Sequence, residues 1–539
     1  PARIPDRGAA AASASGRIGA ARVSEERMGY TSTIYLDYAA TTPVDPQVAA
    51  RMAECLTADG VFGNPASTHR YGREARALVE AARGQVAALI GARSSDVIFT
   101  SGATEANNLA ILGLARGARA AQAAQAARAG RNHGNGGAPA VHVISSRTEH
   151  KAVLDPCRQL ENEGFAVTLL TPDDDGRVTP AQLRDALRPE TALVSLMHAN
   201  NETGAIQDIA AYGAICRAHG AALHVDAAQS AGKLAIDVKA MGIALLSFTA
   251  HKLYGPKGIG ALYVEPAHRV RLQPLLYGGG HERGVRSGTL AVHQIVGFGL
   301  ACELAAQRMS GESARQAQLR ARLWAGIGAI PGALLNSPAA ACLPGVLNVS
   351  FSGIEGESLL FGLAELALAS GSACNSDSDE PSYVLRALGR DRETAQSALR
   401  FSLGAGSSAA DIDLAIAAVR REVLRLRAVA QGEDVAAAAM VSGEAGTRES
   451  GTWVRFMLNL DGERIAGASH QAYGCPQTLA TCEWLAAQLP GRAWREPALG
   501  GALDWVRARE LPADRLTRLL VIEDALRAAL GAAAQRQQP

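Results

Sequence analysis

The chain has 539 residues, of which 48% are hydrophobic and 19% charged, and its formal net charge is +1. This length predicts about two to four domains. The near-zero charge gives no reason to expect nucleic-acid or anionic-membrane partners, and no run of about 18 apolar residues predicts a transmembrane helix. The eight cysteines are scattered along the chain. Their spread argues against a disulfide framework and favours the reducing cytoplasm.

The first segment, residues 1–30, is rich in Ala, Arg and Ser and lacks the apolar core of a signal peptide. Its Arg and Ser content leaves a transit peptide open. The acidic residues Asp6, Glu25 and Glu26 weaken that interpretation. We therefore expect a disordered leader, with Met28 as a natural start.

Residues 33–292 are predicted to form a large α/β domain. Short β-branched or apolar runs alternate there with stretches of helical period, which is typical of a mostly parallel sheet covered on both faces. The predicted strands are residues 97–100, 141–145, 193–198, 222–226, 245–249 and 261–264. The low-complexity segment 115–140 predicts an extended helix and a flexible surface insertion.

Residues 293–431 are predicted to form a second, smaller α/β domain. Helical pattern dominates, interrupted by the strand-like VLNVSF at 346–351. The stretch SGSACNSDSDE at 370–380 holds Cys374 among small, polar and acidic residues, whereas free cysteine is usually buried in a core. This setting marks Cys374 as a candidate reactive thiol.

The remaining chain is predicted to form a linker at 432–437 and a third, α+β domain at 438–535. Two alternating strands flank Asp461-Gly462, which is a hairpin pattern. Helical pattern follows near 476–489 and 514–531.

Three positions in the large domain suggest one cofactor. Lys252 follows a strand, where a lysine amine can form a Schiff base. Asp226 ends the strand about one α/β unit earlier and can pair with the pyridinium nitrogen of pyridoxal phosphate. The turn before Thr104 opens a helix, whose amides with the Thr hydroxyl form an anion site. Each has a plain alternative, a surface lysine or a helix cap, but together they favour this cofactor.

Motifs along residues 33–430 resemble the cysteine desulfurases of the NifS/IscS type. These belong to the class-V aminotransferases among the fold-type-I, aspartate-aminotransferase-like pyridoxal-phosphate enzymes. The motifs are YLDYAATTPVDP, GNPASTHRYG, TSGATEANNLA, TEHKAVL, ANNETG, HVDAAQ, AHKLYGPKGIG, GGGHERGVRSGT, SGSAC and EPSYVLRALG. The resemblance implies a pyridoxal-phosphate-binding large domain and a small domain that carries a catalytic cysteine loop.

The resemblance also implies site residues by position. Catalysis falls to Lys252, His150 and Cys374, and substrate binding to Arg400 with help from Asn348. Cofactor contacts fall to Ala103, Thr104, Asn201, Asp226, Gln229, Thr249, His251, Lys252 and Thr289. Because the residue matched by Thr289 is donated by a neighbouring subunit, a homodimer with shared active sites is implied.

The implied reaction converts L-cysteine to L-alanine and leaves a persulfide on Cys374 for iron–sulfur cluster or thiolation pathways. Sulfur-acceptor and iron–sulfur scaffold proteins are then the expected partners. A selenocysteine lyase or another β-lyase of this fold is the alternative, and a non-catalytic assembly hub is disfavoured because no catalytic position is lost. Asp377 and Asp379 lie near Cys374, and carboxylates disfavour a thiolate. We therefore expect a thiol that is not strongly activated at rest.

The third domain resembles, in part, the iron–sulfur scaffolds of the IscU/NifU amino-terminal type. Cys475 matches their middle cysteine, whereas the first Cys-Gly-Asp motif and the later His-Cys pair are missing, and Cys482 has no counterpart. Three interpretations stay open: a sulfur acceptor at Cys475, a docking or dimerisation module, and a metal site completed by His470, Asp461 or a residue of the desulfurase part. A transient iron–sulfur or zinc contact through Cys374 or Cys475 is also open. No metal ligand is assigned.

Overall fold

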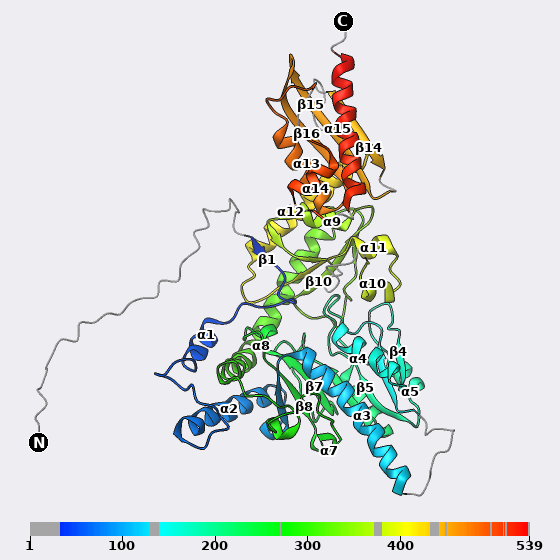
Figure 1. Cartoon of the computed structure of the whole chain (residues 1–539). Coiled ribbons are helices and arrows are strands. Elements are labelled where there is room, and N and C mark those ends of the chain that lie inside the picture. Colours follow the sequence, from blue (N-terminus) through cyan, green and yellow to red (C-terminus); the bar gives the residue numbers. More distant parts are fainter. Residues whose placement is uncertain are drawn as a thin grey trace, which may run out of the picture.

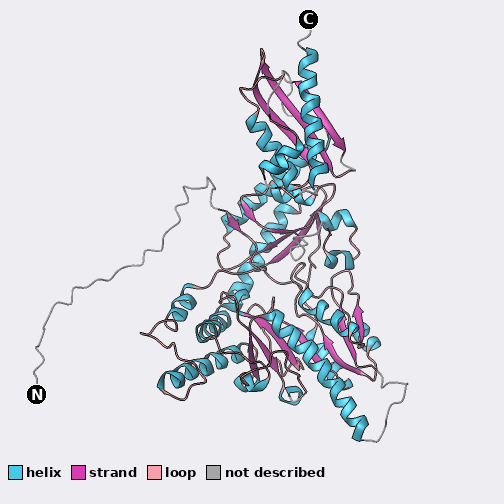
Figure 2. Cartoon of the chain, viewed as in Figure 1, coloured by secondary structure: helices cyan, strands magenta, loops and turns pink. Residues whose placement is uncertain are grey.

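A computed structural model describes the parts of the chain on which the fold rests. The described residues are 33–128, 140–269, 271–370, 380–431, 441–447, 450–495, 499–509, 511–512 and 515–536. The predicted leader, most of the Gly-rich end of the 115–140 insertion, the predicted linker at 432–437 and the segment around Cys374 lie outside them. Three layered units follow one another along the molecule (Figure 1), and Figure 2 shows helices around the sheets of each.

The large domain is built on a seven-stranded sheet that is mostly parallel, as predicted. Its order is β2 (Val97–Thr100), β8 (Gly260–Val264), β7 (Leu245–Thr249), β6 (Ala222–Asp226), β5 (Thr191–Ser195), β3 (His142–Ser146) and β4 (Ala166–Leu170). Only β8 runs antiparallel to its neighbours. The central strands β6 and β7 are buried throughout, as expected for a sheet covered on both faces.

Helices cover both faces of this sheet and pack into two separate apolar clusters. One cluster involves α2 (Arg70–Leu89) and α6 (Ile209–His219), and the other α3 (Ala103–Arg128) and α4 (Lys151–Asn162). The remaining elements of this region are α1 (Pro46–Ala53), α5 (Pro180–Ala186), α7 (Pro266–Arg269) and the short 3₁₀ turns η2 (Ser94–Asp96), η3 (Ala250–Lys252) and η4 (Glu282–Gly284). The N-terminus of α3 and the carboxyl ends of the parallel strands therefore meet at one edge.

The small domain contains a four-stranded sheet and receives the first described strand of the chain. Its sheet order is β12 (Ala369–Ser370), β13 (Leu399–Ser402), β10 (Val346–Phe351) and β9 (Ala333–Leu335). Its helices are α8 (Val292–Ile327), α9 (Gly356–Phe361), α10 (Tyr383–Ala387), α11 (Arg392–Gln396) and α12 (Ala409–Gln431). Strand β1 (Ile34–Tyr35) pairs with β11 (Leu366–Ala367), so residues near 34 join this domain although they precede the large one.

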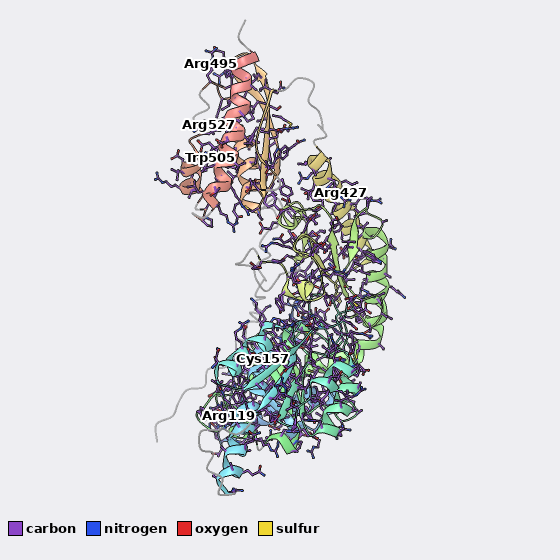
Figure 3. All side chains as sticks on the ribbon, turned by 90° about the vertical axis from the view of Figure 1, so that its right-hand side faces the viewer. Arg119, Cys157, Arg427, Arg495, Trp505 and Arg527 are labelled. Atoms are coloured by element: carbon purple, nitrogen blue, oxygen red, sulfur yellow. The ribbon has the colours of Figure 1, made fainter. Side chains whose placement is uncertain are left out.

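The third domain is a three-stranded antiparallel sheet packed against helices. Strands β14 (Val441–Thr447), β15 (Thr452–Asp461) and β16 (Arg464–Tyr473) run in that order, and the predicted hairpin joins the last two. Helices α13 (Pro476–Gln488), α14 (Ala502–Ala508) and α15 (Leu516–Arg536) close the core around Trp505 (Figure 3). No helix among the described residues has the length and apolarity to cross a bilayer.

The third domain packs on the small domain through one end of α13. The Ser358 hydroxyl of α9 donates to the Gly474 carbonyl at 2.7 Å, and Phe361 joins the apolar core of the third domain. The small and third domains therefore form a continuous interface at the turn that precedes α13.

Candidate active site

A cavity of about 500 Å³ lies where the large-domain strands end and α3 begins. Ligands of open α/β sheets bind outside the carboxyl ends of the strands. Nine predicted site residues line this cavity: Ala103, Thr104, His150, Asn201, Asp226, Gln229, Thr249, His251 and Lys252. The structure thus gathers residues from distant parts of the chain, while their individual roles stay predictions.

One end of the cavity has the features of an anion site. The turn before α3 lies close against the start of β8, because a Cβ on Gly260 would lie 2.7 Å from the Cα of Gly102. The first residues of α3 line the cavity together with Lys257 and His251, and backbone amides at a helix N-terminus favour anions. The Thr249 hydroxyl donates to the Ile259 carbonyl at 3.1 Å, so its proton would have to turn to reach a ligand.

Asp226 is held by two hydrogen bonds at the end of β6. The Asn107 side chain donates to Asp226 Oδ2 at 2.7 Å, and the Ala228 amide donates to Oδ1 at 2.9 Å. Asn107 is completely buried. These bonds aim the carboxylate into the cavity, where it can meet a cationic ring nitrogen.

His150 caps the start of α4 and presents one ring nitrogen to the cavity. Its Nδ1 accepts from the Ala152 amide at 3.1 Å, so the neutral ring carries its proton on Nε2. Burial, more than the nearby ammonium of Lys252, lowers the pKa of His150. A neutral imidazole in this place can stack on a planar group and move a proton.

Lys252 follows β7 and reaches toward the loop after β1. Its ammonium donates to the carbonyl of Ala39 and, at 2.9 Å, to that of Ala40. The Gln229 amide donates to the same Ala39 carbonyl at 2.9 Å. Backbone acceptors thus hold the amine beside the cavity.

Arg400 brings the small domain to the rim of the site. From β13 its guanidinium donates to the Asn201 carbonyl at 3.0 Å and to Asp37 at 2.7 Å. Asn348, opposite Arg400 on β10, donates to the Glu202 carbonyl at 3.2 Å. Arg400 is 3% exposed and does not line the cavity itself, so a substrate carboxylate would have to draw it from these partners.

Two buried carboxyl groups beside the motif residues escaped the sequence analysis. Glu149 accepts from the Met197 amide at 2.7 Å, and burial raises its pKa well above the ordinary value. Burial also raises the pKa of Glu202 to about 7, and its carboxyl group accepts from the Ser382 hydroxyl. Each directly precedes or follows a matched residue, His150 or Asn201, and that adjacency was the only available indication.

Besides Arg400 and Asn348, three further predicted residues lie apart from the cavity or outside the described residues. Cys374 falls outside the described residues. Thr289 is exposed on the large domain and does not line the cavity. Cys475 begins α13 in the third domain, where it is 1% exposed and its sulfur lies 3.3 Å from the Thr478 hydroxyl.

The third domain shows no metal site in its described part. Across the described residues of the whole chain, no three His, Cys, Asp or Glu side chains gather as metal ligands. Cys482 lies inside α13, and burial raises the pKa of its thiol. The metal interpretation therefore gains no support.

The polar groups that line the cavity fit the functional groups of pyridoxal phosphate. The Asn201 side-chain oxygen is buried without a partner among the described residues, although Asn201 lines the cavity. A helix N-terminus with nearby cations can bind a phosphate, a carboxylate can accept from a protonated ring nitrogen, and a lysine amine can form a Schiff base with an aldehyde.

Comparison with known proteins gives consistent matches over the first two domains. Residues 34–414 match the family described as aminotransferase class-V. The chain is 53% identical over 395 residues to the cysteine desulfurase IscS of Pectobacterium atrosepticum, covering 73% of this chain and 93% of that one. The IscS of Proteus mirabilis is 52% identical over the same share of each chain.

Solved structures agree with these matches. A NifS-like protein has a TM-score of 0.63 and 33% identity, covering 72% of this chain and 98% of its own. A structure described as SspA in complex with cysteine has a TM-score of 0.59 and 38% identity, covering 69% of this chain and 99% of its own. These similarities concern the residues that surround the cavity.

Proposed function

The chain belongs to the class-V aminotransferase family and is a cysteine desulfurase of the IscS type, and from that premise we propose how its residues divide the work. The reaction converts L-cysteine to L-alanine and leaves a persulfide on Cys374. The observation that carries the assignment is the convergence of Lys252, Asp226 and His150 on one cavity beside the start of α3. Pyridoxal phosphate, when bound there, supplies a sink for the electrons released at the substrate Cα.

The residues of this chain handle protons and orientation. Lys252 would hold the cofactor through its amine, and the same amine would serve as the base that takes the Cα proton. Asp226, fixed by Asn107, keeps the ring nitrogen protonated, and Arg400 receives the substrate carboxylate in a bidentate pair. His150 stacks on the ring and offers Nε2 for proton transfer.

The sulfur step assigns a thiolate to Cys374. Its sulfur bonds to the substrate sulfur while the bond from Cβ to sulfur breaks, and the electron pair left on Cβ takes up a proton. L-Alanine leaves, and the persulfide stays on the protein for a sulfur-acceptor or iron–sulfur scaffold partner. The thiolate is the reactive form, and since Asp377 and Asp379 are acidic neighbours in the sequence, we expect Cys374 not to be strongly activated at rest.

A homodimer completes this proposal. Thr289 is exposed away from the cavity, as a residue given to a neighbouring subunit would be. The exposed Tyr277 and Leu276 lie close by in the same segment, since the Ser287 amide donates to the Leu276 carbonyl.

All seven described cysteines are free thiols, which supports a reducing cytoplasmic setting.

The third domain is, in this proposal, a degenerate scaffold-like module that serves in docking. A three-stranded antiparallel sheet with a cysteine at the following helix supports the likeness to IscU/NifU-type scaffolds. Burial of Cys475 at the interface with the small domain favours docking over sulfur acceptance.

The test uses purified full-length protein and L-cysteine. We expect alanine in amounts equal to the sulfur released and a persulfide on Cys374, detected by mass spectrometry. The matched variants are Cys374→Ala and, as a control thiol elsewhere in the small domain, Cys342→Ala. Alanine formation that is equal in the wild type and Cys374→Ala would instead favour a β-lyase without a transferable persulfide, such as a selenocysteine lyase.

A further inference from the structure

A second lysine lies behind Lys252, in a cavity that the reaction does not use. This cavity has a volume of about 60 Å³ and lies between α8 and the turn that follows β6. Lys233 and Lys252 both line it, and Lys252 is the one residue that lines both this cavity and the catalytic one. Lys252 therefore borders both cavities, and Lys233 lines the rear one.

The backbone fixes Lys233 in this place. The preceding Gly232 has a φ of 73°, and a Cβ on it would lie 2.7 Å from the Leu253 side chain. The Ser313 hydroxyl of α8 donates to the Lys233 carbonyl at 3.1 Å. The turn is thus held on both sides, and the lysine stem is directed inward.

Hydrogen bonds link Lys233 to Lys252 through two intermediates. The Lys233 ammonium donates to Gln229 Oε1 at 3.4 Å, and the Gln229 amide donates to the Ala39 carbonyl at 2.9 Å. Lys252 donates to the same Ala39 carbonyl. Since Gln229 also lines the catalytic cavity, Lys233 orients a predicted cofactor contact from the side that the cofactor does not reach.

We propose that Lys233 is a positioning residue of the desulfurase: its ammonium fixes the amide of Gln229 and, by charge repulsion, favours the neutral amine of Lys252. This inference rests on the proposed role of Lys252. A cationic neighbour is one of the ways in which proteins activate a lysine nucleophile. A neutral amine is what Lys252 needs in order to take the Cα proton.

The electrostatic surroundings set the pH range in which this role operates. Burial, then the charges of Lys252 and Arg400, lowers the pKa of Lys233 to about 7, so the repulsion acts on the acid side of that pH, where Lys233 keeps its proton. The other charged or titratable groups that line the rear cavity are Tyr38, Asp45, Tyr254, Arg308 and Glu312. Asp45 pairs with Arg308, and Glu312 pairs with Arg315. The acids around the cavity are thus engaged with arginines.

The sign of the effect follows from the repulsion. Removing the charge of Lys233 makes protonation of Lys252 easier, so its pKa rises and the neutral form appears only at higher pH. Lys233→Met removes the charge and keeps an unbranched stem. Lys233→Arg keeps a permanent charge. Lys239→Met removes an exposed lysine from the same segment and is the matched control.

The first measurement is the visible absorbance of the holoenzyme against pH, which reports protonation of the Schiff base without any turnover. We expect the midpoint to rise by about one pH unit in Lys233→Met, a tenfold change in proton affinity, and to stay within about 0.3 unit in Lys233→Arg and Lys239→Met. The apparent pKa of the acid limb in the pH profile of kcat for alanine formation should rise by the same amount. A purely structural role would lower kcat by one factor at every pH.

Coincident midpoints in Lys233→Met and the wild type overturn the inference, as does an equal shift in Lys239→Met. If Lys233→Met does not retain cofactor, Lys233→Gln and Lys233→Arg decide: a midpoint that rises equally in both shows that charge is irrelevant. A wild type that forms no alanine contradicts the proposed function alone, because the absorbance titration still judges Lys233.

Discussion

The catalytic cavity and the start of α13 each hold a side chain of a potentially reactive type, the amine of Lys252 and the thiol of Cys475. The two side chains differ in solvent access and in their polar partners. Lys252 borders two cavities and bonds to backbone carbonyls of a neighbouring loop. Cys475 is 1% exposed, and the carbonyl of the residue before it is fixed by Ser358 of the small domain. The contrast teaches that access and convergent polar partners, rather than residue type, separate a reactive position from a packed one.

Removing the amine of Lys252 is the most severe test of this contrast. In Lys252→Ala we expect alanine formation to fall by at least about a thousandfold, because the base is lost and general-base catalysis alone contributes about 10²- to 10⁴-fold. The Schiff-base absorbance of the purified protein should vanish as well. Both are measured on the same preparation, by alanine assay and visible spectroscopy.

Lys257→Ala is the matched control, since Lys257 lines the same cavity at the anion end. It should keep the Schiff-base absorbance and bind the cofactor less tightly. Persistence of that absorbance in Lys252→Ala would move the covalent attachment to another lysine and remove the basis of the comparison.

Substitution of Asn107, a residue that the sequence analysis did not single out, is expected to have an intermediate effect on cofactor binding. Asn107→Ala leaves Asp226 Oδ2 without its 2.7 Å donor in a buried place, and an unpaired buried acceptor costs about 1–3 kcal/mol. We expect the dissociation constant for pyridoxal phosphate to rise about tenfold, which equals about 1.4 kcal/mol. Fluorescence titration of the cofactor-free protein measures it.

The neighbouring Asn108 supplies the control for this variant. It is half-buried, and its side chain donates to the Thr104 carbonyl of its own helix at 2.9 Å. Asn108→Ala should therefore change the constant by less than about twofold. Equal losses in both variants would mean that the start of α3, rather than the carboxylate, is what the substitution disturbs.

The parts of the molecule that the sequence predicted are those with local patterns. Strands 97–100, 222–226, 245–249 and 346–351 are confirmed because each is a short apolar run bounded by turns. The predicted strand at 193–198 lies instead at Thr191–Ser195, since residues 196–198 leave the sheet and Met197 among them lines the cavity. Strand boundaries depend on pairing partners, which a single segment does not reveal.

Other features needed contacts between distant segments. Strand β14 was not among the predicted strands, and its place is set by packing, since a Cβ on Gly443 would lie 1.9 Å from the Ala529 amide nitrogen of α15. Asn107 lies inside a family motif, but only the fold brings its side chain to Asp226, 119 residues further along the chain. Lys233 is only four residues from Gln229, and it is the packing of this turn against α8 that forms the rear cavity beside it. Packing contacts and hydrogen bonds that orient site residues leave no periodic pattern in the sequence.

The smallest effect is expected at Cys475, where the contrast with Lys252 is sharpest. Cys475→Ser should leave alanine formation and the Cys374 persulfide within about twofold of the wild type, because the thiol is enclosed by Thr478 and the small-domain contact. The free energy of unfolding should fall by about 1 kcal/mol, since a buried hydroxyl replaces a weakly polar thiol.

The wild-type protein offers two further measurements at Cys475. In the native protein, alkylation should reach the partly exposed Cys342 before Cys475. Metal analysis of the full chain should find no stoichiometric zinc or iron. Persulfide on Cys475 after feeding with L-cysteine would contradict the docking role, because sulfur can arrive there only if the interface at Ser358 opens during turnover.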